Sequence, residues 1–269
     1  MGKLVEGDDG LPAEANVGIW TEDKHRTLRA YLQFHAGPRV GYASRTYIDL
    51  FCGPGRAQLK DSERFIDGSA IVAWKSSLEK APFTAVYIAD SDAVRRRACA
   101  ERLGKLGAPV VEVAGDAVQA AQRIVATIDP HGLHFAFVDP YSLGSLQLEL
   151  LRILAGVKRM DQLVHLSAMD LFRNLNFNLA GVRAEFDAFA PGWQEHIPKN
   201  GSKDECRRAI VEHWKTLVDA MGLNTTIDLK AVKNSMNRDL YWLMVLSHHA
   251  LATKFWKIVL QSEPQRQLL

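Results

Sequence analysis

The sequence predicts an α/β protein built on a doubly wound, Rossmann-like, mostly parallel sheet. Three observations support this prediction. Strand-like and helix-like segments alternate along the first two thirds of the chain, which is typical of βαβ units. The strand-like segments are short apolar runs without period-2 alternation, as expected for strands covered on both faces. Near the C-terminus, two strand-like segments flank a turn, which predicts a hairpin with one antiparallel strand.

The first elements follow from local patterns. Residues 1–18 are polar and are expected to form a loop, and Thr21 is expected to cap a helix at 22–35 with acidic residues in its first turn. Five strands and four intervening helices follow at the spacing of βαβ units. The expected strands are 45–51, 84–90, 109–115, 133–139 and 161–170, and the expected helices are 69–80, 91–107, 116–129 and 145–157.

The remainder of the chain is less regular. An aromatic, amide-rich segment and an amphipathic helix form an expected helical insertion at about 171–222, between the fifth and sixth strands. The final elements are strands at 226–234 and 240–250, a turn at 235–239 and a helix at 252–261. Without repeats or a linker, the 269 residues are interpreted as a single domain. A parallel sheet completed by one reversed strand is the shape of class I methyltransferases.

Composition excludes several classes of protein. The net charge of +2 provides no whole-chain basic surface for nucleic acid, although a local patch remains compatible with it. The three cysteines, Cys52, Cys99 and Cys206, form no CxxC pair, so neither a zinc site nor a disulfide framework is expected. No apolar run approaches the roughly 18 to 20 residues that span a bilayer. We therefore expect a cytoplasmic protein with no metal and no membrane association.

The stretch "DLFCGPG", which ends the first strand, is the main functional signal. Ligands bind at the carboxyl ends of strands in open α/β sheets, and glycines let backbone approach a ligand closely. A dinucleotide-binding GxGxxG would need glycine at Gln58, and the phosphate-binding GxxxxGK[ST] is absent. A carboxylate before GxG suits the cationic amino and sulfonium groups of S-adenosylmethionine. The expected cofactor contacts are Asp49, Phe51, Gly53 and Gly55.

Aspartates also end the next three strands. Asp90 is expected to accept the ribose hydroxyls and Asp116 to reach the adenine amino group, while Asp139 ends the fourth strand. The alternative is that aspartate simply favours strand ends and helix caps, which explains Asp116 most easily. That alternative explains all of these positions together less well.

The turn Asp139-Pro140-Tyr141 is the candidate catalytic motif. Enzymes that methylate exocyclic amines carry a [DNS]-P-P-[YFW] turn, whose polar group binds the target amine and whose aromatic ring stacks on the base. This chain has one proline, so the match is partial, and Pro140 is equally compatible with simply ending a strand. Cytosine-C5 chemistry is excluded because no cysteine follows a proline.

A second set of candidates lies just past the fifth strand. Arg173 could contact a phosphate and Asn174 a base edge, although Arg173 could equally pair with Asp170. Aromatic residues interleave with arginines beyond this point, as in a platform for single strands or flipped bases, and the alternative is that they form the core of the insertion. These aromatic residues are Phe172, Phe177, Phe186 and Trp193, and the arginines are Arg173 and Arg183.

Several blocks of the chain resemble one protein family. The blocks "YIDLFCGPGR", "IDGSA", "FVDPY", "DQLVHLSAMDLFRN" and "LYWLMVLSHHALATKFWKI" are similar to those of the three-Cys-motif partner proteins, called TcmP, and follow the same order. The resemblance covers nearly the whole chain. It implies a methyltransferase-like fold and a neighbouring three-Cys-motif protein partner, often in a phage or mobile-element context. The positions that match the family are Asp49, Gly53, Gly55, Gly68, Ser69, Asp139, Tyr141, Asp170, Arg173 and Asn174.

The main hypothesis is therefore an S-adenosylmethionine-dependent methyltransferase acting on DNA or RNA, with an exocyclic amine as the expected acceptor. The alternative is a non-catalytic partner subunit that keeps the fold and binds another protein through its insertion, which the incomplete proline motif favours. A nucleotide-binding hydrolase or dehydrogenase is a weaker third candidate, because its glycine and lysine motifs are missing. The sequence leaves the oligomeric state open.

Overall fold

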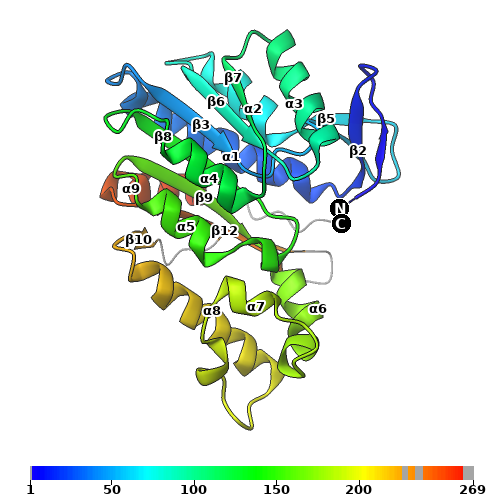
Figure 1. Ribbon diagram of the computed structural model, residues 1–269, viewed down its shortest axis with the longest axis vertical. Coiled ribbons are helices and arrows are strands. Elements are labelled where there is room, and N and C mark those ends of the chain that lie inside the picture. The colour runs from blue at the N-terminus through cyan, green and yellow to red at the C-terminus, as the bar shows by residue number, and fades with distance from the viewer. Residues whose placement is uncertain (1, 226–229, 234–238, 263–269) are drawn as a thin grey trace.

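A computed structural model describes residues 2–225, 230–233 and 239–262 (Figure 1). Its main sheet has eight strands in the order β10-β12-β9-β8-β3-β6-β7, with β11 paired to β12. The strands are β3 (Arg45–Asp49), β6 (Ala85–Ala89), β7 (Val110–Val113), β8 (Leu133–Val138), β9 (Met160–Leu166), β10 (Asn224–Thr225), β11 (Lys230–Lys233) and β12 (Asp239–Ser247).

The strand directions confirm the predicted sheet. All neighbouring pairs from β7 to β9 are parallel, whereas β12 is antiparallel to both β9 and β11. The chain builds β3, β6 and β7 outward on one side and then returns to place β8 on the other side of β3. The point where the strand order reverses therefore lies between β3 and β8, where open α/β sheets bind ligands at the carboxyl ends of their strands.

Helices cover both faces of this sheet. One hydrophobic cluster joins side chains such as Tyr47 to Leu28, Trp74 and Trp256, and the other contains the next strand residue, Ile48. Because neighbouring strand residues both meet apolar layers, the strands lack alternation in sequence. The helices on the first face are α1 (Trp20–Arg39), α2 (Ser69–Ser77), α3 (Ala93–Lys105) and α9 (Ala250–Ser262), and those on the second are α4 (Ala117–Val125) and α5 (Leu148–Ala155).

The N-terminal segment is not the loop that its polarity predicts. It forms the hairpin β1 (Leu4–Glu6) and β2 (Pro12–Val17), and β2 pairs in parallel with β4 (Arg56–Leu59), which pairs with β5 (Phe65–Asp67). The second, four-stranded sheet therefore joins the N-terminus to the segment between the glycine turn and α2 (Figure 1). A pairing between residues so far apart in sequence leaves no local pattern, which is why the prediction was wrong.

Two predicted element boundaries are also wrong. Helix α1 begins at Trp20 after Ile19, without a side-chain cap, so Thr21 lies inside the helix. Strand β9 ends at Leu166, and Asp170 lies not at the end of a strand but in the first turn of α6 (Ala168–Leu179). The hydroxyl oxygen of Ser167 accepts the Asp170 N–H at 3.1 Å, which is the cap that begins this helix.

Helices α6, α7 (Glu185–Phe189) and α8 (Lys203–Asp219) follow β9 and precede the final strands (Figure 1). Phe186 is fully buried and Trp193 is 3% exposed, because both pack into the hydrophobic cluster that contains Trp214. For these two aromatic residues, the alternative that they form a core is therefore confirmed, and they cannot act as a stacking platform. The turn predicted at 235–239 lies almost entirely outside the described residues.

Candidate functional site at the carboxyl ends of the strands

The glycine turn after β3 is shaped by close backbone packing. Gly53 and Gly55 have φ angles of +56° and +79°, which favour glycine. A Cβ on Gly68 would lie 2.9 Å from the backbone of Gly55, so only glycine permits this approach. The Gly68 N–H donates to the Gly55 carbonyl at 2.8 Å, and α2 begins immediately afterwards. A Cβ on Gly53, by contrast, would meet nothing within 4 Å, so this glycine faces open space.

Asp49 lies under this turn and is fully buried. Its carboxylate accepts hydrogen bonds from Ser69 Oγ at 2.6 Å, Tyr47 Oη at 3.1 Å and the Phe51 N–H at 3.2 Å. Burial raises the pKa of Asp49 to about 7, against the effect of the Ser69 hydroxyl. Asp49 therefore joins β3, the turn and the first residue of α2 to one another.

Asp90 holds the turn from the neighbouring strand. One of its oxygens accepts the Gly53 N–H at 3.1 Å and the other accepts the Asp92 N–H at 2.8 Å. Burial raises the pKa of Asp90, although both amides favour its charged form. Each carboxylate oxygen can accept more than one hydrogen bond, so the group retains capacity to bind hydroxyls.

Asp116 follows β7 and is exposed. Its side chain accepts the Gln119 N–H at 2.8 Å and caps α4. Asp116 therefore makes the helix-cap contact that the alternative interpretation of the sequence predicts.

Asp139, at the end of β8, lies between two basic side chains. Lys24 Nζ of α1 is 2.5 Å from one carboxylate oxygen, and His165 Nδ1 of β9 is 3.3 Å from the other. Burial raises the pKa of Asp139, but Lys24 and then His165 outweigh it, so the pKa lies below its usual value. Burial lowers the pKa of His165 to about 4, which leaves its ring neutral at pH 7. No local sequence signal identifies Lys24 or His165 as partners of Asp139, because three separate elements bring them together.

The residues after Asp139 connect the strand to the insertion. Pro140 is buried, whereas Tyr141 is 75% exposed. Two residues further on, the Leu143 N–H donates to Asp170 of α6 at 2.6 Å. The other Asp170 oxygen accepts Asn174 Nδ2 at 2.7 Å.

The two residues expected to bind substrate differ in exposure. Arg173 is exposed, while Asn174 is 8% exposed. The side-chain oxygen Oδ1 of Asn174 accepts a hydrogen bond from Arg183 Nη1 at 2.8 Å. Both the oxygen and the nitrogen of its side-chain amide therefore have protein partners. The sequence offered Asp170 as an alternative partner of Arg173. The two oxygens of Asp170 instead accept hydrogen bonds from the Leu143 N–H and from Asn174 Nδ2.

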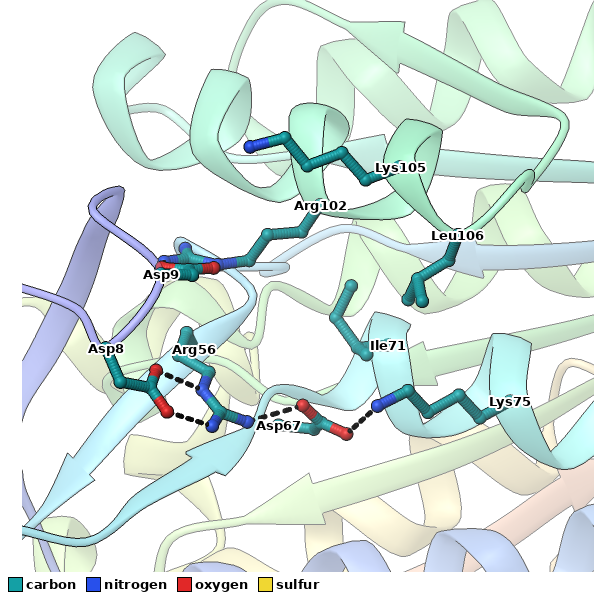
Figure 2. Close-up of a pocket in the computed structure, with 9 residues that line it drawn as sticks. All are labelled: Asp8, Asp9, Arg56, Asp67, Ile71, Lys75, Arg102, Lys105 and Leu106. Atoms are coloured by element: carbon teal, nitrogen blue, oxygen red, sulfur yellow. Dashed lines mark hydrogen bonds and ion pairs between the residues drawn. The ribbon is translucent and has the colours of Figure 1, made fainter.

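A cavity of about 250 Å³ lies beside the second sheet, between α2 and α3 (Figure 2). Arg56 connects Asp8 at 2.5 Å to Asp67 at 2.7 Å, and Lys75 reaches the same Asp67. Above them, Arg102 pairs with Asp9 and donates to the Pro54 carbonyl of the glycine turn at 2.5 Å. Ion pairs and hydrogen bonds of Arg56 and Arg102 therefore hold the N-terminal hairpin against the glycine turn and the strand that follows it.

The described part of the chain contains no cluster of three or more His, Cys, Asp or Glu side chains that could bind a metal ion. Within the same residues, no helix is long and apolar enough to cross a membrane.

Comparison with known proteins supports the fold. No protein-family model and no curated protein matches the chain. Among solved structures, LPL1258 from Legionella pneumophila is 9% identical, with a TM-score of 0.55 over 88% of this chain and 89% of that one. DszA carbon methyltransferase is 11% identical with a TM-score of 0.51, and the match covers 84% of this chain but 54% of that one. Trm1 from Pyrococcus horikoshii, solved with S-adenosyl-L-methionine, is 13% identical over 85% of this chain and 56% of that one, with a TM-score of 0.47.

At such low identities the likeness concerns the fold alone. Together with the strand order and the antiparallel β12, it identifies a class I methyltransferase fold. The chain thus shares its fold with a known carbon methyltransferase.

Proposed function

We propose that the chain is an S-adenosylmethionine-dependent methyltransferase. The observation that carries this proposal is the glycine turn itself: Gly53 has a positive φ angle, faces open space and is held by the carboxylate of Asp90. Such a turn, at the point where the strand order reverses, is suited to a ligand that lies against backbone.

The residues present fit this cofactor. Asp90 would accept the ribose hydroxyls, Gly53 and Gly55 would provide the backbone surface with Phe51 beside it, and Asp116 would lie at the adenine end. Asp49 would act one step away, since its oxygens contact Ser69, Tyr47 and the Phe51 amide and thereby order the turn. Bound S-adenosylmethionine would supply an electrophilic methyl group.

The proposed acceptor is an exocyclic amine of DNA or RNA. Asp139 would accept a hydrogen bond from that amine, Pro140 would fix the turn, and Tyr141 would stack on the base, as its exposure permits. Lys24 keeps Asp139 ionised and therefore able to accept. These residues would orient the amine toward the methyl group of the cofactor, and the amine's proton would leave to solvent, so orientation would contribute most of the catalysis.

The resemblance of the sequence blocks supports a narrower proposal, that the chain is a TcmP protein that works with a three-Cys-motif partner in a mobile-element or phage context. A second candidate function is a non-catalytic partner subunit. The observation that favours it is the contact of Lys24 with Asp139, which fills a position that an acceptor amine would need.

Calorimetric titration with S-adenosylmethionine and S-adenosylhomocysteine tests the cofactor proposal. We expect micromolar binding by the wild type and at least roughly tenfold weaker binding by Asp90→Ala, because hydrogen bonds to a charged group contribute about 1.5–3 kcal/mol. The control is Glu101→Ala, which removes an exposed carboxylate of α3. If the folded wild type bound neither ligand, the stand-alone enzyme would be excluded and the partner subunit favoured.

A further inference from the structure

One face of α6 combines exposed aromatic rings with arginines, and we propose that this face binds single-stranded nucleic acid. The proposal rests on the proposed function, since it names the surface that would hold the acceptor strand. Phe172 is 38% exposed and Phe177 is 47% exposed. At 100° per residue, the exposed side chains of Arg173 and Asn176 lie between these two rings on the helix surface.

Each of the two rings also has a guanidinium group against it. The Cζ atom of Arg207 lies 4.2 Å from the centroid of the Phe172 ring, and that of Arg183 lies 5.0 Å from the centroid of Phe177. Arginine and phenylalanine thus alternate across the face. Proteins bind single strands through aromatic rings that stack on bases and through cations that follow the phosphates.

The polar residues of α6 are divided between its two sides. Asp170, Asn174 and Asn178 face inward, where they bond to Leu143, Arg183 and the Phe186 amide. The acids beside the face are themselves paired, Asp204 with Arg207 and Glu185 with Arg183, which leaves Arg173 as the cation in the middle. Arg173 is therefore the residue that we expect to contact the phosphate backbone.

The face is also connected to the candidate catalytic turn. Asp170, in the first turn of α6, accepts the Leu143 N–H, and the exposed Tyr141 lies two residues before that amide. A strand on α6 would therefore have a third exposed aromatic ring available at the turn that carries Asp139. The hydrogen bond from Leu143 to Asp170 therefore holds the segment after the proposed acceptor site against the first turn of α6.

The test is fluorescence anisotropy with a labelled single-stranded 20-mer of mixed sequence, as DNA and as RNA. We expect Phe172→Ala and Phe177→Ala to weaken binding roughly five- to 150-fold, because each stacked base contributes about 1–3 kcal/mol. Phe177→Tyr, which keeps the ring, should bind like the wild type. Arg173→Gln should reduce the slope of log K against log salt by about 0.7, the value for one phosphate contact. Leu251→Ala, which shortens an exposed apolar residue on α9, should change nothing.

Three results would overturn the proposal. The first is a wild type that leaves both oligonucleotides unbound at about 100 μM, the weak end of non-specific affinities. The second is binding that persists unchanged in both Phe→Ala variants. The third is a wild-type dimer in sedimentation that Phe177→Ala dissociates without any effect on oligonucleotides, which would make the face a contact between two copies. Titration of the same variants with S-adenosylmethionine separates this inference from the cofactor proposal, because the α6 variants should bind the cofactor normally.

Discussion

At the scale of single residues, the site depends on how each carboxylate is paired. Asp49 and Asp139 end adjacent strands and are both largely removed from water, yet their pKa values shift in opposite directions. The neighbours of Asp49 are hydroxyls and an amide, whereas Asp139 meets the ammonium group of Lys24. Environment, rather than residue type or position on the strand, therefore decides which aspartate is ionised.

Asp49 predicts a pH dependence of stability. Its folded pKa of about 7 lies above the usual value, so its stabilising contribution is complete in acid and is lost as the pH rises through 7. In the wild type, the unfolding free energy should decline between about pH 4 and pH 7, by at most a few kcal/mol at ~1.4 kcal/mol per pKa unit. Asp49→Asn should flatten this decline, because asparagine does not titrate. Urea unfolding at several pH values measures this, with Asp187→Asn as the control. An unchanged slope in Asp49→Asn would contradict the assignment.

Lys24 predicts the opposite behaviour at Asp139. Lys24→Met should raise the pKa of Asp139 and destabilise the protein at pH 7 by roughly 1–3 kcal/mol, because the pair is only slightly exposed. The loss should shrink as the pH falls through the folded pKa of Asp139, where the carboxylate becomes protonated in both proteins. Lys105→Met, which breaks the exposed pair with Glu101, should cost about 0–1 kcal/mol. Equal losses in the two variants would show that the Lys24 pair contributes no more than a surface pair.

At the scale of elements, helices α6 and α7 contribute to the candidate site. Asp170 of α6 holds the segment after the Asp139-Pro140-Tyr141 turn, and a Cβ on Gly144 in that segment would lie 3.2 Å from Glu185 of α7. The turn is therefore fixed from two helices that follow β9 in the chain.

This arrangement predicts that Asp170→Asn loosens the turn. The Leu143 amide would lose its carboxylate acceptor, so hydrogen exchange in residues 140–146 should accelerate roughly tenfold or more. Exchange measured by mass spectrometry or on 15N-leucine-labelled protein tests this. Asp187→Asn, which removes a carboxylate bonded to Trp193 in the same region, should leave that segment unchanged. Unaltered exchange in Asp170→Asn would show that the turn is held by its own packing.

At the scale of the whole molecule, the second sheet supports the glycine turn from behind. Arg102 is 6% exposed and donates to Asp9, Pro12 and Pro54, so one side chain of α3 fastens the N-terminal hairpin to the turn.

Arg102→Met should therefore release the hairpin. We expect a loss of roughly 2–4 kcal/mol in unfolding free energy, since one buried and several partly buried acceptors lose their donor, and faster hydrogen exchange in residues 3–17. Arg97→Met, at an exposed position of the same helix, should have almost no effect. If exchange at 3–17 did not change, the hairpin would be held by its pairing with β4 alone.

The sequence by itself determined the sheet, its helical layers, the reversed final strand, the strand ends at which Asp49, Asp90 and Asp139 lie, and the helix cap at Asp116. These follow from apolar runs, caps and glycines, whose effects act between near neighbours in the chain. Only the tertiary structure decided that β2 pairs with β4, that Phe186 and Trp193 are buried, and that Lys24 and His165 meet at Asp139. Such contacts leave no local pattern, because they form only when the sheet brings distant segments together. The contacts of Ser69 with Asp49, 20 residues away, and of Tyr31 with Asp161, 130 residues away, are of this kind.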